Sequence, residues 1–226
     1  GVESLLDEHT RLAYLPGPYG VRLRLTVEAP TAEAARERLA ALELFILERI
    51  GERFVGFDEE TLEVVVGRLL RELGATVAVA ESCTGGHLAD CITSVSGAST
   101  YFRGGVVAYD NAVKVEVLGV DSEVLAREGA VSEIVAIQMA QGVRERLGAQ
   151  VALSTTGIAG PTGGTPDKPV GTVWIGLADA HSAFARCYYL PDERRRFKQR
   201  ATAAALDLLR LHLLQQKVTK TASQYG

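Results

Sequence analysis

The sequence predicts an α/β protein, a three-layer sandwich with a mixed sheet, preceded by a small α+β domain. Short continuous apolar runs at 75–80, 105–109 and 151–155 have the length and composition of strands that are buried on both faces. Helical segments lie between these runs, and helices that alternate with buried strands are typical of a layered α/β domain. Two further strands, 172–178 and 183–190, are joined by a short turn, which predicts an antiparallel pair within the sheet.

Residues 1–58 follow a different pattern, which predicts a separate small domain. Val21–Val27 alternates apolar and polar side chains, as a half-buried strand does. A helix follows, with Thr31 as its expected N-cap and Gly51 as its terminator. Residues 53–57 are predicted to form another short strand. Strand, helix and strand together make a small α+β unit.

From residue 59 onward, several predicted helices carry a local start or end signal. The first has an apolar face and ends at Gly74, because glycine readily takes the left-handed conformation of a helix terminus. Ser132 is the expected N-cap of a longer helix. We expect this domain to span 59–217 and a polar tail, 218–226, to fray. The predicted helices are 62–73, 84–95, 112–118, 122–127, 132–147 and 192–216.

Composition excludes several classes of protein. The chain has 226 residues, of which 47% are apolar, but no apolar stretch is long enough to span a membrane and no signal peptide is expected. Three cysteines predict reduced thiols and a cytoplasmic location. A net charge of −4 gives no broad attraction to nucleic acid, and no metal-binding motif is present, so neither partner is expected. The missing initial Met suggests a fragment of a longer protein.

The segment AESCTGG, at 80–86, is the sharpest chemical signal. It follows a buried strand and precedes a predicted helix, where N–H groups stabilise a bound anion or an oxyanion. Ser82 is therefore a candidate nucleophile. An equally good interpretation of the local pattern is that Ser82 only caps the helix and the glycines only permit a tight turn. The segment fits neither a P-loop, nor a Gly-x-Ser-x-Gly elbow, nor Ser-x-x-Lys.

Cys83 is a rival nucleophile because a helix N-terminus lowers a thiol pKa. A catalytic cysteine usually needs a histidine partner, and His87 is expected to lie on the helix itself. The sequence therefore favours a structural role for Cys83.

Tyr109 and Lys114 straddle the end of the next strand and the start of a helix. Both would reach the neighbouring strand end that bears Ser82. A lysine that is partly buried there has a lowered pKa and accepts the serine proton. Each residue alone is commonplace, and only the coincidence with Ser82 gives them weight.

Two later segments are suited to an anion. The Gly-rich loop 155–164 follows a strand, and small residues let backbone amides approach a phosphate closely. The alternative interpretation is that the glycines only make this loop mobile. The run 194–198 is basic and opens the last helix. A solvated face is the common explanation, but cations at a helix N-terminus favour an anionic partner.

These motifs, in this order, resemble the C-terminal domain of the CinA family, the nicotinamide-nucleotide amidases. The resemblance covers 59–216 and rests on five segments, which are AESCTGG at 80–86, GVVAY at 105–109, GAVS at 129–132, TGIAGP at 156–161 and KPVGT at 168–172.

The resemblance implies that the chain deamidates nicotinamide mononucleotide to nicotinic acid mononucleotide and ammonia, without a metal or cofactor and usually as a homodimer. It implies that Ser82 is the nucleophile and that Tyr109 and Lys114 assist its proton transfers. Which of Arg194, Arg195, Arg196 and Lys198 meets the phosphate stays open. The implied substrate-binding residues are Cys83, Thr84, Gly85, Gly86, Thr156, Gly157 and Arg194.

Residues 1–58 resemble the small KH-like connecting domain of CinA proteins, in which a nucleotide pyrophosphatase-like domain comes earlier. Gly17–Gly20 fits the Gly-x-x-Gly spacing of an RNA-binding KH loop, but Pro16 and Pro18 favour a turn. With seven basic and twelve acidic residues, 7 − 12 = −5, the first sixty residues are unsuited to RNA. An alternative to the enzyme is an inactive or nucleotide-binding assembly module.

Overall fold

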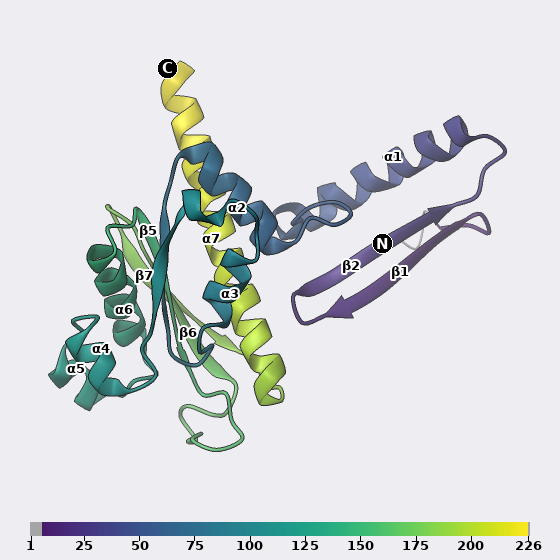
Figure 1. Ribbon diagram of the computed structural model, residues 1–226. Helices are drawn as coiled ribbons and strands as arrows, with labels where there is room; N and C mark the ends of the chain where they lie inside the picture. Colours follow the sequence, from purple (N-terminus) through teal and green to yellow (C-terminus); the bar gives the residue numbers. More distant parts are fainter. Residues whose placement is uncertain (1–5, 226) are drawn as a thin grey trace. The chain divides into compact units, whose positions relative to one another are not determined.

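The computed structural model describes residues 6–225. The chain divides after Glu59 into two compact units, which are described separately below (Figure 1).

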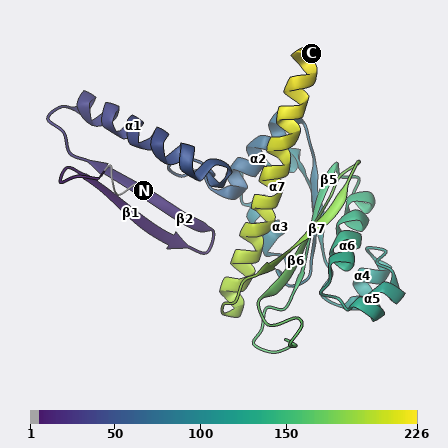
Figure 2. The ribbon, with the colours of Figure 1, turned by 180° about the vertical axis from the view of Figure 1, so that it is seen from behind.

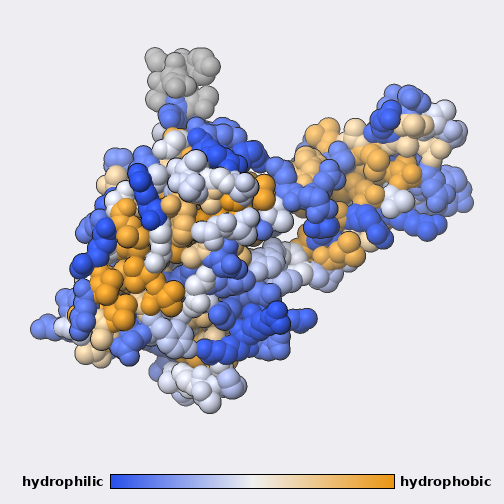
Figure 3. Space-filling view, in the orientation of Figure 1, coloured by the Kyte–Doolittle hydropathy of each residue, from blue (hydrophilic) through white to orange (hydrophobic). Residues whose placement is uncertain are grey.

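The first unit is a β-hairpin with one long helix. β1 (Thr10–Gly17) and β2 (Gly20–Val27) pair antiparallel, and Gly17 faces Gly20 across the turn, so the Gly-x-x-Gly segment is a hairpin turn as Pro16 and Pro18 suggested. The apolar face of the hairpin is incompletely covered, because Tyr14 and Val21 are 58% and 60% exposed; apolar surface is visible on this unit in Figure 3.

The helix of this unit confirms the capping argument. α1 (Ala32–Ile50) begins after Thr31, whose Oγ1 accepts a hydrogen bond of 3.2 Å from the Ala34 N–H, and Gly51 caps its other end with a φ of 52°. The predicted strand at 53–57 is wrong. The chain forms a short 3₁₀ turn, η2 (Gly51–Arg53), and β2 pairs instead with the earlier strand β1.

The second unit contains a five-stranded mixed sheet in the order β4-β3-β5-β6-β7. β3 is parallel to both β4 and β5, whereas β5, β6 and β7 are joined by antiparallel pairing, which confirms the predicted fold class. The strands are β3 (Val77–Glu81), β4 (Phe102–Val107), β5 (Val151–Gly157), β6 (Thr172–Ala178) and β7 (Ala183–Tyr189).

Helices cover both faces of this sheet and so complete three layers (Figures 1 and 2). One face carries α2 (Leu62–Leu73), α3 (His87–Thr93) and α7 (Arg194–Tyr225), and the other carries α6 (Glu133–Arg146). Two short helices, α4 (Asn111–Glu116) and α5 (Ser122–Glu128), precede α6, and η3 (Ala98–Thr100) is a 3₁₀ turn before β4.

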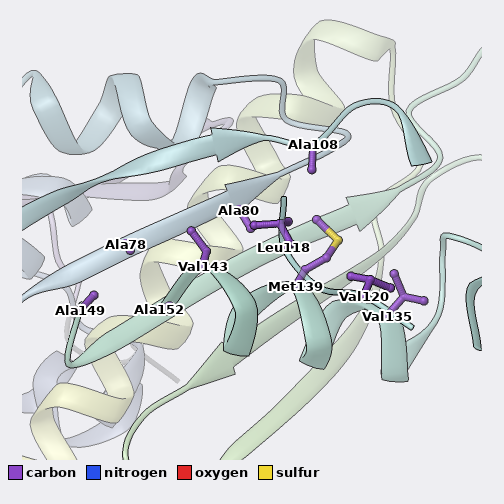
Figure 4. Close-up of a cluster of buried hydrophobic side chains, with 10 residues drawn as sticks. All are labelled: Ala78, Ala80, Ala108, Leu118, Val120, Val135, Met139, Val143, Ala149 and Ala152. Atoms are coloured by element: carbon purple, nitrogen blue, oxygen red, sulfur yellow. The ribbon is translucent and has the colours of Figure 1, made fainter. Parts of the chain in front are cut away.

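A buried apolar cluster joins the sheet to α6 and to the segment after α4. Figure 4 shows small side chains of β3 and β5 against larger ones of α6, a match of shapes that lets the layers pack closely. Its members are Ala78, Ala80, Ala108, Leu118, Val120, Val135, Met139, Val143, Ala149 and Ala152.

Two helices differ from their predicted bounds. α3 begins at His87 rather than near Thr84, because Gly85 and Gly86 take φ values of 58° and 93° and the chain turns before the helix starts. α7 runs on beyond Gln216 to Tyr225. No glycine or proline interrupts it there, and Lys217 is bonded to Glu72 of α2 at 2.8 Å. No helix in residues 6–225 is apolar over a sufficient length to cross a membrane.

Candidate active site

The carboxyl ends of the three parallel strands bring the predicted residues to one edge of the sheet. Glu81, the last residue of β3, lies between Val107 of β4 and Thr155 of β5. The Ser82 N–H donates to the Thr155 carbonyl at 2.9 Å, and the Ala108 N–H donates to the Glu81 carbonyl at 2.7 Å. Ser82 is therefore flanked by the strand that leads to Lys114 and by the strand that carries Thr156.

Ser82 does not cap a helix. Gly86 occupies the position before α3, and the Ser82 side chain is half-buried with no hydrogen bond to another described residue. The Glu81 carboxylate acts in its place and accepts a hydrogen bond of 2.9 Å from the Gly86 N–H. The Gly86 N–H is thus engaged by a protein carboxylate, and the implied role of Gly86 in substrate binding stays a prediction. The Gly85 N–H has no acceptor among residues 6–225 and faces no such competition.

Lys114 lies in α4, the helix that follows β4, and is buried, with 1% of its surface exposed. Its Nζ donates to the Ala108 carbonyl at 2.9 Å, to Asn111 Oδ1 at 3.2 Å and to the Tyr109 carbonyl at 3.4 Å. Burial lowers the pKa of the Lys114 amine, while Asp110 and Cys83 act in the opposite direction.

Cys83 is 6% exposed, and burial raises the pKa of its thiol to about 12. The thiol therefore stays protonated at neutral pH and is a weak nucleophile. His87 is the histidine nearest to Cys83 in the sequence, and its Nδ1 lies 3.9 Å from Asp90 Oδ2 on the same helix, α3. These observations favour Ser82 over Cys83 as the nucleophile.

Neighbouring threonines of β5 face opposite sides of the sheet, as strand geometry requires. Thr156 donates through Oγ1 to the Ala130 carbonyl at 2.7 Å. Thr155, which the sequence reasoning did not single out, lies 2.7 Å from Thr84 Oγ1. A run of hydroxyls inside a fully buried strand was the signal that could have identified it. Gly157 has a structural reason to be glycine, because a Cβ there would lie 2.7 Å from the Thr172 carbonyl.

The basic residues at the start of α7 differ in their contacts. Arg194 donates to the Tyr109 hydroxyl at 2.7 Å and to the Gly160 carbonyl at 2.9 Å, and so links the loops that follow β4 and β5. Lys198 lies beside the Ser82 turn, since a Cβ on Gly85 would be 3.4 Å from its Nζ. Arg195 and Arg196 are exposed. Of these four cations, Arg194 and Lys198 are the two with contacts to the segments that follow β3, β4 and β5.

No group of three or more metal-ligating side chains occurs in the described part of the chain. The polar groups at this end of the sheet are hydroxyls, backbone N–H groups, cations and the Glu81 carboxylate, whose oxygens accept from protein donors. This set suits nucleophilic attack on a carbonyl and binding of an anionic substrate.

Fold and site together define a three-layer α/β protein with a serine-centred polar site at the carboxyl ends of its parallel strands. Residues 59–213 match the family model of the CinA C-terminal domain, and residues 2–56 match that of the damage-inducible protein CinA KH domain. The chain belongs to the CinA family.

Curated relatives match this chain over most of its length. A CinA-like protein of Salinibacter ruber is 51% identical over 206 residues, which cover 91% of this chain and 50% of that protein. A CinA-like protein of Trichormus variabilis is 46% identical and covers 95% of this chain and 54% of its own length. This chain thus spans about half the length of the curated relatives it matches.

Solved structures match a smaller part of the chain. The competence/damage inducible protein CihA of Agrobacterium tumefaciens is 35% identical, with a TM-score of 0.64, over 70% of this chain and 98% of its own. A CinA superfamily protein of Klebsiella pneumoniae is 31% identical, with a TM-score of 0.66, over 68% of this chain and 96% of its own.

Proposed function

We propose that this chain hydrolyses the carboxamide of nicotinamide mononucleotide to nicotinic acid mononucleotide and ammonia. The observation that supports the proposal is that two suitable groups follow neighbouring parallel strands: Ser82, whose hydroxyl has no hydrogen-bond partner among the described residues, follows β3, and Lys114, buried and with a lowered pKa, lies in α4 after β4. Because β3 and β4 are parallel neighbours, both segments leave the same end of the sheet, which supports the proposed pairing. The family resemblance names the amide.

In the first half of the reaction, neutral Lys114 accepts the Ser82 proton as Oγ attacks the carboxamide carbon. The Gly85 N–H, which has no acceptor among the described residues, is available to stabilise the resulting oxyanion, with the Lys198 ammonium nearby. Tyr109 relays the proton from Lys114 to the leaving nitrogen, which departs as ammonia. An acyl–Ser82 ester remains.

In the second half, water attacks the ester carbonyl and gives up a proton to Lys114, which returns it to Ser82 as the acid is released. Arg194 is suited to hold the phosphate, because its guanidinium already bridges Tyr109 and the Gly160 carbonyl at the rim of the site. The assignment of Thr84, Thr156 and Gly157 to the substrate site comes from the resemblance alone, since Thr84 and Thr156 are buried and their hydroxyls bond to protein groups. A homodimer remains a prediction from the resemblance.

The test is ammonia release from the mononucleotide, the riboside and the free base, measured side by side. We expect the mononucleotide to be the best substrate and Ser82→Ala to lower kcat by about 10³-fold or more. Ser94→Ala is the matched control, because the Ser94 hydroxyl donates only to the Cys91 carbonyl, at 2.7 Å, on the far end of α3. A Ser82→Ala variant with full activity would sink the nucleophile assignment.

A nucleotide-binding assembly module is the second candidate, favoured by one observation: the curated relatives are about twice as long as this chain. Calorimetric titration of the mononucleotide, with product followed in the same sample, separates the two. Binding without product supports the assembly module, and binding with turnover supports the amidase.

A further inference from the structure

Glu81 is a buried carboxylate that the proposed reaction does not use. It is 1% exposed, and it is the last residue of the strand that leads directly into Ser82. A charge placed so deeply is retained only where hydrogen bonds compensate for its lost hydration. Its partners therefore indicate what the charge does.

All of these partners belong to the Ser82 turn or to the first residues of α3. Oε2 accepts from Thr84 Oγ1 at 2.6 Å, from the Gly86 N–H at 2.9 Å and from the Leu88 N–H at 3.0 Å. Oε1 accepts from the Ala89 N–H at 2.8 Å. One carboxylate thus fixes both ends of the turn and the start of the helix.

The Glu81 charge also sets the direction of the neighbouring hydrogen bonds. A hydroxyl has a single proton, and Thr84 uses its own toward Glu81, so Thr155 must donate to Thr84. The backbone of Thr155 in turn accepts the Ser82 N–H at 2.9 Å. Glu81 and Thr84 therefore fix the residues that follow Ser82, and Thr155 fixes the backbone of Ser82 itself.

We propose that Glu81 is the positioning residue of the serine turn: its carboxylate fixes Ser82 and the unbonded Gly85 N–H in the geometry that the reaction requires. The inference rests on the proposed amidase function and assigns Glu81 no contact with substrate. Its carboxylate oxygens are occupied by protein donors, so it acts through Ser82 and does not exchange protons with the substrate.

Glu81→Gln is the direct test. An amide keeps the shape but has one acceptor oxygen, so its NH₂ group must face either the Ala89 N–H or the three donors at Oε2. We expect kcat to fall about 10²-fold, the effect of a misplaced catalytic group, with KM changed by less than about threefold. The acid limb of the pH–rate profile should stay where it is, since Lys114 is the base; a shifted limb would mean that Glu81 itself titrates in the reaction and would overturn the proposal.

Two further variants keep the test decisive. Val143→Ala removes buried volume from the core of α6 without touching the turn, and should lower stability but leave kcat unchanged. Thr84→Val deletes one donor to Glu81 and should lower kcat about tenfold. If Glu81→Gln does not fold, Thr84→Val is compared with Val143→Ala, and equal kcat values overturn the proposal.

Acetylation of Ser82 by p-nitrophenyl acetate, read by mass spectrometry, tests positioning without the natural substrate. Slower acetylation of Glu81→Gln than of wild type supports positioning even if no ammonia is released from the mononucleotide, in which case the proposed function alone fails. Equal acetylation rates, or a folded Glu81→Gln enzyme with wild-type kcat, overturn the positioning role and leave the proposed function standing.

Discussion

Lys114 illustrates how burial and hydrogen-bond partners set the protonation of a side chain. In the described residues, its Nζ hydrogen bonds all go to neutral oxygens, and its surface is almost wholly buried. Neutral acceptors compensate for a buried charge less well than a carboxylate does. The neutral amine is therefore favoured, which is why the pKa of Lys114 lies below that of a free lysine.

This shift predicts the pH dependence of the proposed amidase. The base must be unprotonated, so kcat/KM should rise with pH to a plateau. The midpoint of this rise should lie at an apparent pKa below the ordinary lysine value of about 10.4. Lys114→Arg should be inactive throughout, because a guanidinium keeps its proton. A rise centred at or above the ordinary lysine value would contradict the assignment. Lys168→Arg is the control: its Nζ contacts the Glu128 carbonyl at 2.6 Å, away from the serine turn.

At the residue scale, sequence reasoning selects groups that follow an apolar strand. Ser82, Tyr109 and Lys114 each follow such a run, and the strand order β4-β3-β5 places their strand ends together. Glu81 directly follows an apolar run and Thr155 ends one, and the sequence does not show which partners their side chains meet. Only the folded chain shows that Thr155 meets Thr84 and that Glu81 takes the Gly86 N–H.

At the scale of elements, helix ends with local caps are predictable and turns fixed by distant partners are not. Thr31, Gly51 and Gly74 mark real helix ends because the cap is within a few residues of the helix. The start of α3 is set by the Glu81 carboxylate, which the pattern around Thr84 does not reveal. β1 escaped prediction because Leu12, Ala13, Tyr14 and Leu15 obscure its alternation.

The close approach of α6 to the segment after α4 supports a prediction at this scale. A Cβ on Gly142 would lie 1.8 Å from the Leu118 carbonyl oxygen, so the helix cannot accept a side chain there without moving. Alanine in place of glycine favours a helix by about 1 kcal/mol, but overpacking costs about 1–3 kcal/mol. We expect Gly142→Ala to lower the free energy of unfolding, measured in urea.

Gln141→Ala is the matched control, since Gln141 is exposed on the same helix and should change stability by less than about 0.5 kcal/mol. An unchanged or raised urea midpoint for Gly142→Ala would show that α6 shifts at little cost. The same variant should slow the proposed amidase, because the segment that Gly142 contacts leads back to α4 and Lys114.

At the scale of the whole molecule, the two units differ in what they contribute to the site. Ser82, Tyr109, Lys114 and Arg194 all belong to the second unit, which has its own sheet and its own buried cluster. The solved relatives from Agrobacterium tumefaciens and Klebsiella pneumoniae align over 98% and 96% of their own length with only 70% and 68% of this chain. A chain of that extent is therefore sufficient for the fold.

We therefore expect residues 60–226 to fold alone and to keep kcat/KM for the mononucleotide within about twofold of the longer chain, because a domain with its own core and its own site needs no support from a second. The measurement is ammonia release, with thermal unfolding of both chains as the check on folding and Ser82→Ala in the shortened chain as the blank. A shortened chain that melts normally but loses activity would show that residues 1–59 take part in catalysis, and the hairpin and α1 would then be the next elements to mutate.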